Sequence, residues 1–153
     1  MSELDDLLQP SVAPAEKRPF PWRVSSQFWV AFFGGIPAVT VIAFLNARRL
    51  GATARKQQGI VLSGVAAAVV FAGLFAWMQT MDASSRSMGR LAGRVLAVLL
   101  YLVLAHIQRE DDGRYQVFGG GQYASLWIPG ILACVISALA LIGGALVAVK
   151  LLS

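Results

Sequence analysis

The sequence predicts an all-α fold, an integral membrane four-helix bundle that follows a disordered N-terminal tail. Composition is the first reason: 57% of the residues are hydrophobic and 14% are charged, whereas about a quarter are charged in soluble globular domains. The second reason is that four apolar runs approach or exceed the roughly 18 to 20 residues that a helix needs to cross a hydrocarbon core about 30 Å thick. Small residues also recur at four-residue spacing within these runs, which favours close helix packing in lipid.

The basic character of the chain agrees with this class of protein. The formal charge is +5, and the thirteen Lys and Arg residues lie mainly between the apolar runs. Basic residues in such places set membrane orientation and contact lipid phosphates. We therefore expect the lipid bilayer and its anionic headgroups as partners, and no nucleic acid. The single cysteine, Cys134, has no partner for an internal disulfide and leaves the redox compartment open.

Residues 1–26 form the tail, which we predict to be cytoplasmic and largely disordered. Its prolines disfavour regular structure. Phe20 and Trp22 precede the first apolar run, where aromatic side chains anchor a protein at the membrane interface. We do not expect this run to be a cleaved signal peptide, because it follows a long polar segment and no small-residue cleavage pattern comes after it.

The membrane domain is expected at residues 27–153, with spans at about 27–48, 58–80, 90–107 and 126–150. The third span requires Arg90 and Arg94 to extend to the interface, because the stretch without charge begins only at Val95. In the loop before the fourth span, three glycines lack the Lys and Ser/Thr of a phosphate-binding loop and are better explained as a turn.

The stretch FFGGIPAV, from Phe32 to Val39, concentrates residues that weaken helices. Pro37 has no N–H and its ring displaces the carbonyl of Phe33, which predicts a bend in the first span. Gly34 and Gly35 open the helix surface to a neighbour. We favour a packing role for this kink, and the alternative is the broken helix of a transport site.

The second span carries the clearest row of small side chains. Its members follow one another at four-residue steps, so we expect them to face a neighbouring helix. They are Gly64, Ala68, Ala72 and Ala76.

The membrane interior offers little chemistry for transport or catalysis. Asp and Glu are missing from all four expected core segments, where ion and proton carriers usually place such groups. The deep polar side chains are Thr40, Ser63, Tyr101 and Ser137, which suit helix packing. We expect no catalytic residue and no cofactor.

Two groups of charged residues near the interfaces have functional alternatives. Arg86, Arg90 and Arg94 fall at four-residue steps and could hold lipid headgroups, although an ordinary collar of snorkelling side chains is the simpler interpretation. His106 and Glu110 are weak candidates for a metal site, because the chain has one histidine and no cysteine nearby.

The run from Ala31 to Gly51 resembles the opening signature of uncharacterised small multi-span bacterial inner-membrane proteins. That signature has a Phe-Gly-Gly-Pro-like start and then an Asn and a Leu-Gly. The resemblance implies a bacterial source and several spans, and it transfers no activity. It also directs attention to Asn46, which we expect to end the first span by bonding local backbone, the alternative being a bond to a second helix. The matching residues are Phe33, Gly34, Gly35, Pro37, Asn46, Leu50 and Gly51.

These features lead us to expect a non-enzymatic protein of a bacterial inner membrane with a structural or interaction role, as a homo-oligomer or beside a membrane-protein partner. A small channel or transporter using the kinked first span is the alternative, and an enzyme acting on lipid ranks lower. With four complete spans the basic residues divide almost evenly between the two sides. We expect both termini in the cytoplasm, because the basic tail would otherwise have to be translocated.

Overall fold

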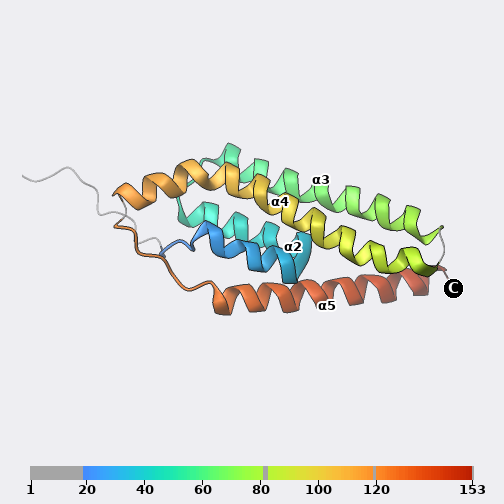
Figure 1. Ribbon diagram of the computed structural model, residues 1–153. Coiled ribbons are helices and arrows are strands. Elements are labelled where there is room, and N and C mark those ends of the chain that lie inside the picture. Colours follow the sequence, from blue (N-terminus) through green and yellow to red (C-terminus); the bar gives the residue numbers. More distant parts are fainter. Residues whose placement is uncertain (1–18, 81–82, 119, 153) are drawn as a thin grey trace, which may run out of the picture.

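The computed structural model describes residues 19–80, 83–118 and 120–152, with side chains for all of these except 79, 83–87, 90 and 144–152. A short 3₁₀ helix, η1 (Val24–Ser26), leads into four α-helices: α2 (Gln27–Arg49), α3 (Ala54–Gln79), α4 (Ala83–Phe118) and α5 (Trp127–Leu152). The predicted all-α architecture with four helices is confirmed (Figure 1). Of the expected disordered tail, residues 1–18 lie outside the described residues, whereas Trp22 and Val24 are buried.

α2 is interrupted at Gly35, where φ is 70° and ψ is −163°. This backbone conformation is open to glycine and strained for residues with a Cβ. The interruption divides α2 into a first arm, residues 27–34, and a second arm, residues 36–49. Pro37 then lies in the first turn of the second arm. Backbone N–H groups in a first turn have no partner within the helix, so proline costs no helical hydrogen bond there. The break therefore arises from the φ of Gly35 and not, as expected, from a bend that Pro37 imposes on a continuous helix.

The two arms lie side by side in opposite directions and form a re-entrant helical hairpin (Figure 1). The backbone N–H of Trp22 donates a hydrogen bond of 2.7 Å to Oδ1 of Asn46, a residue 24 positions away. In a continuous helix the two residues would be about 36 Å apart, at 1.5 Å per residue. α2 therefore enters and leaves at the same end of the bundle, which we call the near end; it holds Trp22, Asn46 and the start of α3.

Three helical segments are long and apolar enough to cross a membrane, namely Val24–Arg49, Ala54–Met78 and Leu91–Phe118. A shorter apolar segment, Trp127–Gly143, lies in α5. The reversal at Gly35 shortens the reach of the first segment, because arms 27–34 and 36–49 extend only about 12 and 21 Å. The complete first span that we expected at 27–48 is thus replaced by a hairpin.

α3, α4 and α5 run the length of the bundle in alternating directions (Figure 1). At the near end Lys56 of α3 pairs with Asp111 of α4 at 2.9 Å. Further along, Phe71 of α3 lies against Gly93 of α4. α5 starts at the near end, where Ala124 N–H donates to the Pro21 carbonyl at 2.9 Å. The end of α5, the end of α3 and the start of α4 lie at the opposite end, which we call the far end (Figure 1).

The hairpin is the centre of the bundle. Its side chains Ala31 and Val39 are fully buried and pack with Ile60 of α3 and Leu104 of α4. A second cluster joins the other side of α2 to the start of α5 through Val30, Ala38, Ile42 and Leu126. Within the described residues, α5 packs against α2 and against no other α-helix.

The packed face of α3 follows steps of three and four residues. Ile60 and Gly64 are buried, and Ala67 and Phe71 pack against the core. Alternating steps of three and four residues average 3.5 residues, which is close to one helical turn, so these side chains stay on one face of the helix. A strict four-residue step instead turns by about 40° at each repeat, because a helix has 3.6 residues per turn. The expected small-residue row therefore winds away from the bundle. Its first member, Gly64, touches Thr40, whereas the other three are exposed: Ala68, Ala72 and Ala76.

Candidate functional site: a re-entrant hairpin and its polar anchor

The two glycines at the tip of the hairpin, Gly34 and Gly35, have different structural roles. Gly34 is buried, and a Cβ added to it would come within 2.7 Å of the Cys134 sulfur on α5. Gly35 has open space around it but needs its positive φ to reverse the chain. Gly34 therefore allows a close approach between helices, and Gly35 makes the turn.

The backbone at the tip finds partners within the bundle. Ser137 of α5 is 4% exposed, and its hydroxyl donates to the Gly34 carbonyl at 2.9 Å. The Thr40 hydroxyl donates to the Ile36 carbonyl at 2.8 Å. Non-helical backbone at membrane depth requires such partners, since lipid cannot supply them.

The tip lies deep in the bundle. Ser137 is ten residues beyond Trp127, the first residue of α5, so it lies about 15 Å along that helix. This distance is about half of a typical hydrocarbon core. With α5 crossing a bilayer from the near end, the hairpin reaches about its midplane.

Three buried amides fix the open end of the hairpin to α4. The Asn46 side-chain amide donates to Gln108 Oε1 at 2.9 Å, and the Gln27 and Gln108 amides face one another at 3.4 Å. Gln27 and Asn46 are fully buried, and Gln108 is 1% exposed. We call these three residues the amide anchor. Because Gln27 belongs to the first arm and Asn46 to the second, one glutamine of α4 holds both arms.

The amide anchor changes the interpretation of Asn46. We expected this residue to bond local backbone and end a span, but it reaches across to a second helix and also accepts from Trp22. Gln27 and Gln108 were not among the functional residues expected from the sequence. The available signal was an uncharged amide beside each of two apolar runs, although the pairing joins residues 81 positions apart.

Aromatic and cationic groups cover the near end. The Arg49 guanidinium lies 3.8 Å from the centre of the Trp22 ring and donates to the Phe20 carbonyl at 3.0 Å. Trp22 is only 3% exposed, whereas Phe20 is 53% exposed. Phe20 is therefore free to contact an interface, while Trp22 packs inside the protein under Arg49.

His106 and Glu110, the weak candidates for a metal site, do not have, among the described residues, the neighbours that a metal site needs. Glu110 pairs with Lys56 at 3.0 Å and with Arg114 at 2.6 Å, and His106 is exposed. In the part of the chain that the structure describes, no three His, Cys, Asp or Glu side chains gather as a metal site would require. Glu110 acts here as a partner for two cations.

Of the three arginines considered for headgroup contact, Arg94 can be placed. Its guanidinium lies 5.7 Å from the centre of the Phe32 ring, on the first arm of the hairpin. The side chains of Arg86 and Arg90 lie outside the described residues. Arg94 is thus oriented toward the hairpin.

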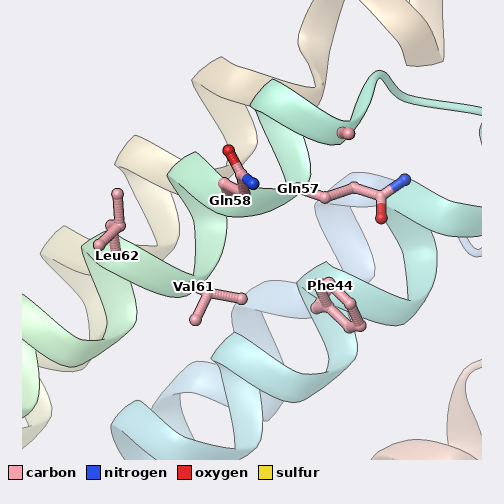
Figure 2. Close-up of a pocket in the computed structure, with 6 residues that line it drawn as sticks. Phe44, Gln57, Gln58, Val61 and Leu62 are labelled. Carbon is pink, nitrogen blue, oxygen red and sulfur yellow. The ribbon is translucent and has the colours of Figure 1, made fainter.

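Two open recesses, each of about 490 Å³, flank the near end. The first is mainly apolar and lies between α2 and α3; Figure 2 shows Phe44 of α2 facing Val61 of α3 there. The second, which we call the polar recess, is bounded by η1, the end of α4 and the loop before α5. Its lining residues are Arg23, Ser25, Asp112, Gln116, Gly121 and Tyr123.

The loop that closes the polar recess is a glycine turn, as expected. Gly120 and Gly121 have φ values of 78° and 65°, which favour glycine. The turn brings the Tyr123 hydroxyl to Asp112 Oδ1, to which it donates at 2.9 Å. Burial raises the pKa of Tyr123, and the bond to Asp112 acts in the same direction, so the phenol remains a donor at neutral pH.

Comparisons of the chain with protein-family models, with curated proteins and with solved structures gave no match. Its role must therefore be argued from its own geometry.

Proposed function

We propose that this chain is a non-enzymatic, multi-pass protein of a bacterial inner membrane with a structural or protein-interaction role. The observation that supports this role most directly is the closed tip of the hairpin. Ser137 bonds the Gly34 carbonyl, and the carbon side chains of α3, α4 and α5 surround the two arms. In transport sites the backbone of a broken helix is instead turned toward an ion or a substrate.

The bacterial inner-membrane location rests on the sequence resemblance described above. Its signature residues include Gly34 and Gly35 at the tip and Asn46 in the amide anchor. In this chain the signature therefore coincides with the residues that build the hairpin. A structural purpose for the signature agrees with the proposed role.

Co-purification and flux measurements test the role together. The full chain is extracted from native membranes in mild detergent, and the co-purifying proteins are identified and quantified. The purified chain is also reconstituted into vesicles, and release of potassium and of small fluorescent solutes is recorded. We expect a stoichiometric partner, either another membrane protein or a second copy of the chain, and release no faster than from empty vesicles.

A small channel or transporter is the second candidate, and the depth of the hairpin favours it. Re-entrant segments that stop near the midplane line conduction paths in many membrane proteins. On this hypothesis the native chain releases solute from vesicles, and a Gly35→Ala variant that still inserts releases much less. That pair of results would replace the structural role with a transport role.

We also propose an orientation, with the near end in the cytoplasm. Among the described residues the near end carries seven Lys and Arg residues, whereas the far end carries Arg86, Arg90, Arg94 and Lys150. Basic residues are enriched on the cytoplasmic side. The even division that we expected assumed a complete first span. With α2 folded back, residue 19 and the end of α5 fall on opposite sides, and the shared location of both termini is withdrawn. The seven residues are Arg23, Arg48, Arg49, Arg55, Lys56, Arg109 and Arg114.

A further inference from the structure

The polar recess presents both signs of charge to one space. Arg23 approaches from the segment before η1, and Asp112 approaches from the end of α4. Among the described residues no ion pair joins them. Two opposite charges that share a recess of about 490 Å³ without pairing suit a ligand that carries both charges.

The carboxylate of Asp112 is held in a fixed orientation. Tyr123 donates to Oδ1 at 2.9 Å, and the Gln116 amide donates to Oδ2 at 3.3 Å. Each carboxylate oxygen has a second lone pair for a further donor. A primary ammonium, with three N–H donors, matches this acceptor, whereas a trimethylammonium has no N–H to donate.

The cation of the recess is held by the same tyrosine. The Arg23 guanidinium lies over the Tyr123 ring, 5.5 Å from its centre. Ser25 also lines the recess. A guanidinium and a hydroxyl are common donors to phosphate oxygens.

The recess opens where lipid headgroups would lie. It is at the near end of the membrane helices, and the first residues of α5 beside it, Trp127 and Ile128, are 79% and 75% exposed. Exposed tryptophans are typical of the membrane interface. An apolar surface for acyl chains therefore starts next to a polar site for a headgroup.

We propose that the polar recess binds an ethanolamine phospholipid, with the phosphate at Arg23 and Ser25 and the ammonium at Asp112. The inference requires the near end to lie at a membrane surface, and it holds whether the hairpin is structural or conducting. Phosphatidylglycerol offers the same phosphate to Arg23 but only neutral hydroxyls, and no cation, to Asp112. A choline lipid places methyl groups against the carboxylate.

Native mass spectrometry of the delipidated full chain tests the proposal. The chain is titrated with phosphatidylethanolamine, phosphatidylcholine and phosphatidylglycerol that have identical acyl chains. We expect phosphatidylethanolamine to bind about tenfold more tightly than phosphatidylcholine, as the added charged hydrogen bonds require. Asp112→Asn should abolish that preference, and Arg23→Gln should weaken all three lipids.

Glu110→Gln is the matched control, because it removes a carboxylate from the same helix outside the recess. It should retain the full preference. Tyr123→Phe keeps the ring and removes one donor to Asp112, and it should give a partial loss. Circular dichroism and thermal unfolding identify any variant that fails to fold.

Two results would overturn the proposal. One is equal affinity of the native chain for phosphatidylethanolamine and phosphatidylcholine, and the other is an unchanged preference in folded Asp112→Asn. Glycerophosphoethanolamine, the soluble headgroup, separates the sources of the ligand. If it binds as tightly as the intact lipid, the site takes a soluble zwitterion and the lipid assignment is wrong.

Discussion

Trp22 and Asn46 are joined by a hydrogen bond from a backbone N–H to a side-chain oxygen, across the open end of the α2 hairpin. The amide nitrogen of the same asparagine donates to Gln108 of α4. One side chain thus links the second arm of the hairpin to the segment that leads into the first arm and to α4.

Asn46→Leu should therefore destabilise the chain by about 1 to 3 kcal/mol, because it leaves the buried N–H of Trp22 without an acceptor and leaves Gln108 Oε1 with only the 3.4 Å bond from Gln27. Unfolding of the purified protein in detergent, followed by circular dichroism, measures the loss. Gln58→Leu removes an exposed amide and should change stability by less than about 0.5 kcal/mol. Equal stability of the two variants would contradict the role of the amide anchor.

Gly35→Ala should destabilise the chain by about 1 to 2 kcal/mol, since alanine is strained at a φ of 70°. Gly59 of α3 has helical backbone and open space around it, so Gly59→Ala should be neutral or stabilising by up to about 1 kcal/mol. Pro37→Ala should also cost little, because no helical hydrogen bond is missing at that position. The same unfolding assay compares the three variants, and a larger loss for Pro37→Ala than for Gly35→Ala would mean that proline makes the break.

Gly64→Leu should destabilise α3 packing by about 1 to 3 kcal/mol or more, because its side chain would collide with Thr40. Ala72 lies eight residues further along α3 and is exposed. Ala72→Leu should therefore change the free energy of unfolding by less than about 0.5 kcal/mol. Thermal unfolding of both variants in the same detergent tests the face assignment. A loss in Ala72→Leu and none in Gly64→Leu would reverse it.

Fusions at two positions test the orientation. A fluorescent protein that matures only in the cytoplasm should stay dark after Ser153 and become bright when inserted at Gly120, whereas an exported phosphatase should show the opposite activities. The α4–α5 loop lies at the near end and the end of α5 at the far end, and the positive charges favour a cytoplasmic near end. Fluorescence at both positions would mean that α5 does not cross the membrane.

The helical class could be predicted from the sequence, whereas the path of the backbone in α2 could not. Hydropathy measures which residues a segment contains, so Val24–Arg49 qualifies as a span by length and composition although its backbone reverses at Gly35. Next to this reversal, Gly34 packs against Ser137 and Cys134, which lie about a hundred residues later in the chain. Likewise, small residues at four-residue spacing in α3 were visible, but which of them face the bundle depends on the neighbours of Ile60 and Phe71.

The bond between Ser137 and Gly34 spans 103 residues, and this separation sets an order of events during synthesis. At roughly 5 to 20 residues per second, a ribosome needs roughly 5 to 20 s after making Gly34 to add the serine that caps its carbonyl. α3 and α4 are made during that interval and can pack beside the hairpin, whereas the part of α5 that holds Ser137 is still missing. A nascent chain halted before Ser137 therefore carries an uncapped carbonyl in the membrane, and quality-control proteases should remove it faster than the finished protein.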